Sequence, residues 1–229
     1  MSNAIIQKTR EDYNKIAGHF SATRHRLWDE LLEFVALVKD GQNILDWGCG
    51  NGRLILLLKD KKIKYFGLDQ STELLKEAKK QNAGSIKDGW VKFFCTAAKD
   101  KKFPADFFDV VFMIASFNHL PDYKSRINLL KNIYKEMRPG GKIVMSNWNL
   151  KGDWIMKKKE MEEIGNNDYY ITWKDPKGVP QAKLYYHHFE KEELEKLLDE
   201  AGFEMERNEY DKQRRNLITV AIKKCVFSK

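Results

Sequence analysis

A glycine-rich run after a short apolar stretch is the strongest chemical signal in the sequence. Residues 45–52 read LDWGCGNG, with Asp46 just ahead of the alternating glycines Gly48, Gly50 and Gly52. Glycine permits tight turns and lets a ligand approach the backbone closely. A carboxylate at Asp46, the end of a predicted strand, would repel a pyrophosphate and attract an ammonium group. The run therefore predicts a pocket for a ligand that carries an ammonium group.

The residue after the glycine run separates two classes of ligand. A dinucleotide fingerprint, GxGxxG, would have its third glycine at position 53, where this sequence has Arg53. A second acid, Asp69, ends the next apolar stretch within GLDQS (67–71), and a carboxylate there can accept both hydroxyls of a ribose. The alternative for Asp69 is helix capping, for which Ser71 is already a candidate. An acid for an ammonium group and an acid for a ribose favour S-adenosylmethionine over NAD.

The elements that must hold these residues alternate between strand and helix. Apolar runs predict strands at 44–47, 64–69, 90–94, 108–116, 142–148, 203–209 and 216–224. Helical spacing predicts helices at 54–58, 71–80, 127–137 and 190–203, the last ending at Gly202. This alternation predicts a doubly wound, mostly parallel α/β sheet with an antiparallel strand near its C-terminal end. Such sheets bind ligands at the carboxyl ends of their strands, where the motifs lie.

The 229 residues suit a single domain, 1–229, in which two segments stand outside the alternation. Residues 1–40 are predicted to form helices over the active site. Residues 149–185 are rich in Lys, Asn, Gly and aromatic side chains and are predicted to form an inserted cap on the substrate side. The KKK run at 157–159, among aromatic residues, suits a flap that faces RNA. A solvated helix followed by a β-hairpin is the alternative.

Composition limits the partners and the compartment. The formal net charge is +8, from 41 basic and 33 acidic residues, which favours acidic partners, nucleic acid first, although a Lys-rich solvated surface gives the same balance. Three cysteines without CxxC spacing argue against a disulfide framework and suggest a reducing cytoplasm, and no metal site is predicted. No apolar run approaches the roughly 20 residues that span a bilayer, so no membrane partner is expected.

The glycine run and the two acids resemble motif I of the class I S-adenosylmethionine-dependent methyltransferases. The resemblance implies a Rossmann-like sheet of seven strands. Members usually carry an acid after the third strand that binds adenine; FFCTAAKDKKFP (93–104) lacks it, so backbone N–H groups near Ala97 and Ala98 would take that role. IASFNHL (114–120) is similar to the segment that faces the transferred methyl group. The residues that this resemblance assigns to the cofactor are Asp46, Gly48, Cys49, Gly50, Asp69, Gln70, Ala97, Ala98 and Ala115.

Two further segments resemble one subgroup, the tRNA wobble-uridine carboxymethyl methyltransferases. YNKIAGHFSATR (13–24) matches its N-terminal signature except that Asn14 replaces an Asp. LYYHHFEKEELE (184–195) matches a second signature, with Leu184 in place of an Arg and Lys183 beside it. FNHL (117–120) is a weaker third match, with Asn118 for the first of two histidines. The subgroup esterifies the carboxylate of 5-carboxymethyluridine in the anticodon loop, which implies a tRNA substrate.

The resemblance assigns substrate residues to both segments. Arg24 would hold a carboxylate by its bidentate fork, and the aromatic rings would stack on an unpaired base. The predicted substrate pocket contains Arg24, Tyr186 and His187, and the predicted RNA contacts are Tyr13, His19, Phe20, His119, Tyr185 and Lys183. For any one histidine, a buried side chain bonded to a backbone carbonyl is the alternative. No general base is assigned, because an ionised carboxylate is already nucleophilic; an amine nucleophile would make His119 or His187 base candidates.

Two rival functions and one partner stay open at the level of sequence. A small-molecule methyltransferase for a quinol, an amine or a carboxylic acid would share motif I and a lid. A non-catalytic module that binds the cofactor or RNA would share the fold, although Asp46 and Asp69 argue against it. Eukaryotic relatives work with a small zinc-binding activator subunit that pairs by strand addition, and the sequence leaves open whether this chain has such a partner.

Overall fold

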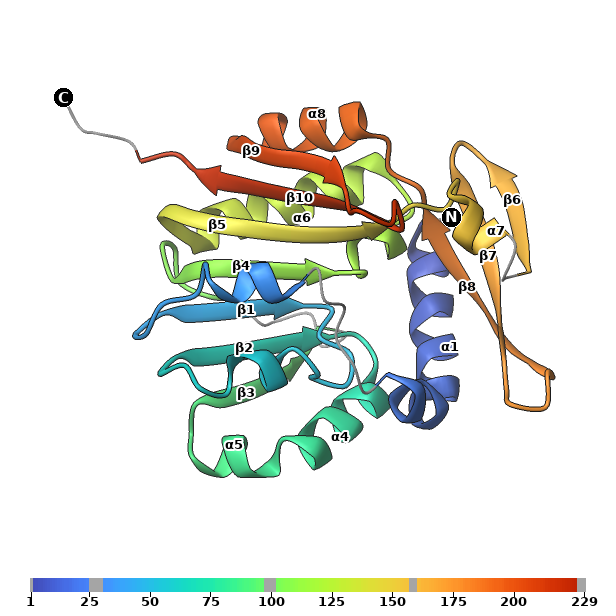
Figure 1. Cartoon of the computed structure of the whole chain (residues 1–229), viewed down its shortest axis with the longest axis horizontal. Helices are drawn as coiled ribbons and strands as arrows, with labels where there is room; N and C mark the ends of the chain where they lie inside the picture. The colour runs from blue at the N-terminus through green and yellow to red at the C-terminus, as the bar shows by residue number, and fades with distance from the viewer. Residues whose placement is uncertain (1, 25–30, 97–101, 157–159, 226–229) are drawn as a thin grey trace.

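A seven-stranded sheet forms the centre of the protein in a computed structural model, which describes residues 2–24, 31–96, 102–156 and 160–225 (Figure 1). In the described part of the chain the strand order is β3-β2-β1-β4-β5-β10-β9. The strands are β1 (Asn43–Trp47), β2 (Lys64–Asp69), β3 (Val91–Cys95), β4 (Phe108–Ile114), β5 (Met137–Trp148), β9 (Phe203–Tyr210) and β10 (Asn216–Lys223).

The pairing of the strands confirms the predicted sheet. The strands β1 to β5 pair in parallel, and β10 runs antiparallel to both β5 and β9. The chain leaves β1 toward β2 and β3 and then returns to β4 on the other side of β1, so the order reverses between β1 and β4. A crevice opens at such a reversal outside the carboxyl ends of the strands. The strand β5 begins earlier than predicted because a register shift lets Met137 pair with Phe108 ahead of the regular ladder.

Helices cover both faces of this sheet. The helices α6 (Tyr123–Glu136) and α8 (Lys191–Ala201) bury Leu130 and Leu197 in one apolar cluster, and α2 (Leu32–Val35) and α3 (Ile55–Leu58) bury their side chains in another. The helices α4 (Thr72–Gln81) and α5 (Ala83–Lys87) lie beside β3 at the edge. The predicted signals mark the ends: Ser71 Oγ accepts the N–H of Leu74, and Gly202 ends α8 at φ +99°.

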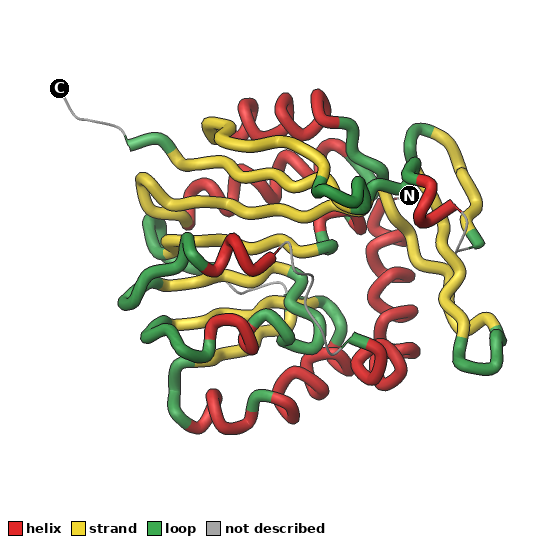
Figure 2. The backbone as a smooth tube through the Cα atoms, in the orientation of Figure 1, coloured by secondary structure: helices red, strands yellow, loops and turns green. Residues whose placement is uncertain are grey.

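The long N-terminal helix lies between the main sheet and a second, smaller sheet (Figures 1 and 2). This helix, α1 (Ser2–Thr23), runs past the carboxyl ends of the parallel strands. Beyond it, β6 (Met161–Gly165), β7 (Asp168–Lys174) and β8 (Pro180–His187) form an antiparallel sheet after the short helix α7 (Asp153–Met156). The region predicted as an inserted cap is thus a short helix followed by β-strands, and the KKK run at 157–159 lies outside the described residues.

Polar and apolar contacts both fix α1 in this place. Ile16 packs with Trp148 at the end of β5 and with Leu184 in β8, in an apolar cluster separate from the two sheet faces. Asn14 Oδ1 accepts hydrogen bonds from Ser71 Oγ at 2.7 Å and from the N–H of Glu73 at 3.2 Å, which ties α1 to the first turn of α4. Among the described helices, none combines the length and the apolar character that crossing a membrane requires.

Candidate active site

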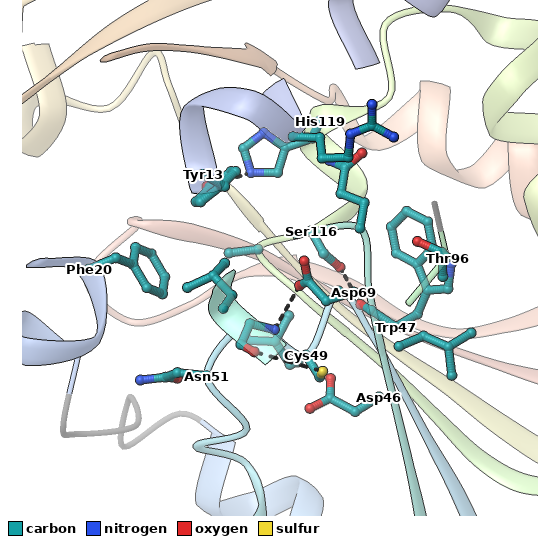
Figure 3. Close-up of a pocket in the computed structure, with 18 of the residues that line it drawn as sticks. Tyr13, Phe20, Asp46, Trp47, Cys49, Asn51, Asp69, Thr96, Ser116 and His119 are labelled. Carbon is teal, nitrogen blue, oxygen red and sulfur yellow. Dashed lines mark hydrogen bonds between the residues drawn. The ribbon is translucent and has the colours of Figure 1, made fainter. Parts of the chain in front are cut away.

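A cavity of about 270 Å³ lies where α1 crosses the carboxyl ends of β1, β2 and β4 (Figure 3). One part of its wall comes from the main sheet and includes Asp46, Gly48, Cys49, Gly50, Arg53, Asp69, Gln70, Thr96 and Ala115. The other part comes from α1, the turn after β4, the end of β5 and the small sheet and includes Arg10, Tyr13, Phe20, Arg24, His119, Trp148, Trp173 and Tyr186. Segments far apart in sequence therefore enclose one site.

The glycine run brings the ends of β1 and β4 into close contact. Gly48 has φ +75°, and a Cβ atom on it would lie 2.3 Å from the Cβ of Ser116. Ser116 Oγ instead donates to the carbonyl of Trp47 at 2.7 Å, across the crevice between the two strands. Ala115 has φ +50°, a strained value for a residue with a Cβ, while its N–H donates to the carbonyl of Ser146. Strain of this kind is typical of functional sites.

Asp69 holds the glycine run and the start of α4 at the same time. Its Oδ2 accepts the N–H of Gly50 at 2.8 Å, and its Oδ1 accepts the N–H of Ser71 at 2.8 Å. Burial raises the pKa of this carboxyl, against the effect of these backbone hydrogen bonds. Each carboxylate oxygen has a second lone pair, so Asp69 can still accept hydroxyl groups of a ligand in the cavity.

Asp46 is a buried acid that borders the same cavity. The hydroxyl of Tyr65 donates to its Oδ2 at 2.5 Å, and only 3% of the residue is exposed. Burial raises the pKa of Asp46 to about 7, while the positive charge of Arg53 acts in the opposite direction. Burial also lowers the pKa of Arg53 to about 10. A cation brought next to Asp46 would favour its ionised form.

The outer part of the cavity presents a guanidinium among aromatic rings. The guanidinium carbon of Arg24 lies 5.6 Å from the ring centroid of Phe20 and 5.2 Å from that of Trp173. Its Nη1 donates to the carbonyl oxygen and the hydroxyl of Thr23 at 3.4 and 3.5 Å, and no ion pair between Arg24 and a described carboxylate is found. Trp148 and Tyr186 stack nearby with centroids 5.0 Å apart. The cavity wall thus combines a cation with flat rings.

His119 connects the two sides of the cavity. Its Nδ1 lies 2.7 Å from the carbonyl oxygen of Tyr185, and its Nε2 lies 2.9 Å from the hydroxyl of Tyr13 (Figure 3). The hydroxyl of Tyr13 also lies 3.4 Å from that of Tyr186. Burial lowers the pKa of His119 to about 4 and raises the pKa of Tyr186 to about 12, so both side chains are neutral at pH 7.

Several predicted site residues lie away from the cavity. His187 Nδ1 faces Asp168 at 2.6 Å and its Nε2 faces Glu193 at 3.0 Å, so both ring nitrogens have carboxylate partners in a hydrogen-bond network that joins β7 and β8 to α8. Tyr185 donates its hydroxyl to the same Asp168 at 2.5 Å. His187 and Tyr185 therefore do not line the cavity, because their carboxylate partners hold them within the small sheet; their predicted substrate roles stay predictions.

Lys183 and His19 also do not line the cavity. Lys183 of β8 is exposed and pairs across β7 with Glu162 of β6 at 2.7 Å. His19 accepts the indole N–H of Trp173 at its Nδ1, 3.0 Å away, and so positions a ring that does line the cavity. Ala97 and Ala98 lie outside the described residues, and Thr96 is the described residue at the end of β3 that reaches the cavity.

The cavity wall also contains residues that are not among the predicted site residues, including Arg10, Arg53, Trp148 and Trp173. Arg10 could have been predicted from helical spacing. It lies three positions before Tyr13 on α1, and residues three apart lie on the same face of a helix. Trp148 ends β5, and the carboxyl end of a parallel strand is where ligands bind.

The comparison with known proteins decides the family. The family described as "Methyltransferase domain" matches residues 20–208 of the chain. The chain belongs to this methyltransferase family. Its methyl donor is S-adenosylmethionine, and the predicted fold and enzyme class are confirmed.

Curated relatives of this methyltransferase have several names. The "tRNA (carboxymethyluridine(34)-5-O)-methyltransferase" of Schizosaccharomyces pombe is 27% identical over 218 residues, which cover 87% of this chain and 90% of the relative. A protein of that activity from Xenopus tropicalis is 31% identical over 65% of this chain, which spans only 22% of its length. The "Ubiquinone biosynthesis O-methyltransferase" of Idiomarina loihiensis is 29% identical over 89% of this chain and 84% of its own.

A solved structure extends the comparison of the fold. The complex between the Haloferax volcanii Trm112 methyltransferase activator and a putative methyltransferase matches with a TM-score of 0.70 at 17% identity, over 96% of this chain and 100% of that one. At this identity the likeness establishes the fold alone.

The cavity of the methyltransferase fits its cofactor. Two buried carboxylates suit the ammonium group and the ribose, and Gly48 and Gly50, both at positive φ, let a ligand approach the backbone. The bound cofactor supplies an activated methyl group on a positively charged sulfur. The protein must align a nucleophile with that methyl group and exclude water.

Proposed function

We propose that this methyltransferase esterifies a carboxylate on a modified wobble uridine of tRNA. The observation that carries the proposal is the position of Arg24: a guanidinium on the cavity wall, in front of the rings of Phe20 and Trp173. A guanidinium can bind a carboxylate through two parallel hydrogen bonds, and aromatic faces can stack on an unpaired base. The similarity to relatives named tRNA (carboxymethyluridine(34)-5-O)-methyltransferase supports the same substrate.

The state of His119 favours a nucleophile that arrives ionised. A hydroxyl or amine substrate must lose a proton during the reaction, so it needs a nearby base. His119 is the histidine of the described cavity wall; both of its ring nitrogens have partners, and its pKa is lowered to about 4. A carboxylate needs no such base. The cavity therefore suits a carboxylic acid better than a quinol or an amine.

A basic hairpin beside the cavity supports a polyanionic substrate. Asn216 starts β10 opposite Trp148, a cavity residue, and the loop before it contains Lys212, Arg214 and Arg215. Asn149 fixes that loop by donating its side-chain amide to the carbonyl of Arg214 at 2.9 Å. Basic side chains in this loop can contact the phosphates of nucleotides next to the modified one.

The test is methyl transfer from labelled S-adenosylmethionine to tRNA taken from cells that lack this enzyme, followed by digestion to nucleosides and mass analysis. We expect label in an alkali-labile ester on a modified uridine. Arg24→Gln should lose most activity, while Arg24→Lys, which keeps the charge without the fork, should retain part of it. Label only in an alkali-stable nucleoside, or only in a small molecule, would contradict the proposal.

Salt dependence gives a second test with a matched control. Arg214→Ala/Arg215→Ala should weaken tRNA binding and lower the slope of log affinity against log salt by about one per lost phosphate contact. Lys61→Ala/Lys62→Ala removes two charges just before β2, at the opposite ends of the parallel strands, and should change neither. An equal effect of both double variants would indicate unspecific attraction.

We also propose that a small zinc-binding activator docks by strand addition at β3. In the described sheet β3 pairs only with β2, so its other edge is open to a further strand. The Haloferax complex shows that a methyltransferase of this fold pairs with an activator of the Trm112 type. Thr96 donates its N–H to the carbonyl of Asp69 in β2, so by the alternation of a strand the N–H of Cys95 faces the other edge of β3. Co-purification tests the proposal: Cys95→Pro would remove that backbone donor and should reduce capture of the activator. A cytoplasmic location remains a prediction.

A further inference from the structure

A buried tyrosine in β2 holds one oxygen of Asp46. The hydroxyl of Tyr65 donates to Asp46 Oδ2 at 2.5 Å, and the tyrosine is fully buried. Asp46 pairs with Gly67 on the neighbouring strand, and Tyr65 precedes that glycine by two residues, on the same face of the sheet. Because Gly67 has no side chain, the phenol can extend past it to the carboxyl group. Phe93 packs against the ring of Tyr65, with centroids 6.1 Å apart, and helps to fix it there.

The hydrogen bond from Tyr65 leaves one oxygen of Asp46 for a ligand. No other acceptor for the Tyr65 hydroxyl is found among the residues that the structure describes, so its single proton goes to Oδ2. Oδ2 is therefore an acceptor whether Asp46 is ionised or protonated. When Asp46 is protonated, its proton must lie on Oδ1. Asp46 borders the cavity, and Oδ1 is the oxygen that remains for a ligand there.

The surroundings of Asp46 favour a protonated carboxyl group in the cofactor-free protein. Burial raises its pKa to about 7, against the effect of the Tyr65 hydrogen bond. The negative charge of Asp69 also raises this pKa, and the positive charge of Arg53 lowers it. Asp46 and Asp69 lie on the same side of the cavity with Cys49 between them (Figure 3). Burial raises the pKa values of Tyr65 and Cys49 as well, so both are neutral near pH 7.

The proton on Oδ1 and the ammonium group of the cofactor compete for one oxygen of Asp46. An ammonium group has three N–H donors and no acceptor, and a protonated carboxyl oxygen is itself a donor. We propose that Tyr65 confines the proton of Asp46 to the oxygen that faces the cavity, so that the ammonium group of S-adenosylmethionine displaces this proton when it binds. The O–H bond of Asp46 breaks, the proton passes to the solvent, and the carboxylate remains with the ammonium group. Tyr65 is thus a positioning residue that acts through Asp46.

Displacement of a proton makes the cofactor affinity depend on pH in both directions. Below about pH 7 the free protein must give up the proton of Asp46, so the affinity falls as the pH falls. Above about pH 8 the α-amino group of the cofactor loses its own proton, so the affinity falls again. The affinity is therefore highest between these two values. The inference rests on the cofactor assigned to the cavity and involves no RNA, so it is independent of the proposed tRNA substrate.

Isothermal titration calorimetry of the full chain measures the displaced proton directly. Titrations at pH 6, in buffers of low and high ionisation enthalpy, should show the release of about one proton per bound S-adenosylmethionine. 5′-Methylthioadenosine, which keeps the adenosine but has no ammonium group, should bind without release. Absence of release with S-adenosylmethionine would overturn the proposal. Equal release with both ligands would overturn it as well, because the proton would then come from Asp69 at the ribose.

Tyr65→Phe tests the positioning role of the phenol. This variant loses a hydrogen bond that favours the ionised carboxylate, so the cofactor affinity at pH 7 should fall roughly tenfold, the effect of one hydrogen bond to a charged group. The pH at which half of the proton is released should also rise. Tyr185→Phe is the matched control: Tyr185 donates to Asp168 at 2.5 Å as well, away from the cavity, so cofactor binding should not change. Wild-type affinity with an unchanged pH profile in Tyr65→Phe contradicts the role of Tyr65, as do equal losses in both variants.

Infrared difference spectra identify the carboxyl group that ionises. Addition of saturating S-adenosylmethionine to the wild-type protein at pH 6 should remove the C=O stretch of a protonated carboxyl group. Asp46→Asn should lack this change and should release no proton in the calorimeter. Loss of the same band in Asp46→Asn would assign the proton to another acid and overturn the proposal.

Discussion

Replacement of Asp69 by Asn separates its structural role from its role in ligand binding. The carboxylate accepts one backbone N–H at each oxygen, those of Gly50 and Ser71, both at 2.8 Å. An amide can accept only one of them and turns its own N–H₂ group toward the other. A buried N–H left without a partner costs about 1–3 kcal/mol. For a protein of this size the melting temperature should fall by roughly 3–10 °C even without cofactor.

The assay is thermal unfolding of the cofactor-free protein, followed by titration with S-adenosylmethionine. Asp122→Asn is the matched control. Asp122 caps α6 by accepting the N–H of Ser125 at 2.9 Å with one oxygen and the Ser125 hydroxyl at 2.7 Å with the other; an Asn keeps the first bond, and its N–H₂ group can donate to the hydroxyl, which can also accept. We expect Asp69→Asn to lose both stability and cofactor affinity, and Asp122→Asn to lose neither. If Asp69→Asn melts within about 1 °C of the wild type while losing affinity, the carboxylate does not hold the glycine turn.

Three further substitutions follow from the same geometry. Gly48→Ala should prevent folding or cost several-fold in cofactor affinity, because its Cβ would meet Ser116 at 2.3 Å; thermal unfolding and titration would measure both. Asp46→Asn should stabilise the cofactor-free protein at pH 8.5 more than at pH 5.5. Burial raises the pKa of Asp46 in the folded protein from 3.8 to about 7. The wild-type protein therefore loses about 1–4 kcal/mol of unfolding free energy, relative to the Asn variant, as the pH rises through about 7. Equal differences in melting temperature between variant and wild type at both pH values would contradict this. Asn14→Ala should lower stability by about 1 kcal/mol through the lost contacts to Ser71, whereas Asn14→Asp should melt near the wild type.

The replacement of an Asp by Asn14 illustrates how a departure from a family pattern can be neutral. The side-chain oxygen accepts hydrogen bonds from Ser71 and Glu73 at the start of α4, and an amide oxygen can do this as well as a carboxylate. Leu184 is a different case: it is buried in the apolar cluster that holds the small sheet to α1, where a guanidinium would need a partner. The position where the resemblance implies an Arg therefore lies in this apolar cluster and not in the cavity wall.

Local signals predicted the main sheet, and several of the residues predicted to hold the cofactor line one cavity. Continuous apolar runs marked the buried parallel strands, and Ser71 and Gly202 marked the ends of helices. Asp46 and Asp69 line the cavity because each ends a parallel strand, and such ends meet at one edge of a sheet. The start of β5 was missed because its first residues pair through an irregular register that no periodic pattern reveals.

The substrate side was less predictable, since its residues are brought together by packing between distant segments. His187 and Tyr186 are neighbours in sequence, yet alternation along β8 turns Tyr186 toward the cavity and gives His187 two carboxylate partners. Trp173 reaches the cavity because β7 pairs with β8 and packs with α1.

The sequence by itself determined the strand ends, the glycine turn and the acids beside it, because each depends on contacts within a few residues. Only the tertiary structure decided which histidine borders the cavity and which groups its two ring nitrogens meet, the carbonyl of Tyr185 and the hydroxyl of Tyr13. These properties depend on a carbonyl of β8 and a hydroxyl of α1 that meet a turn after β4. A hydrogen bond between such segments has no periodic or compositional trace along the chain.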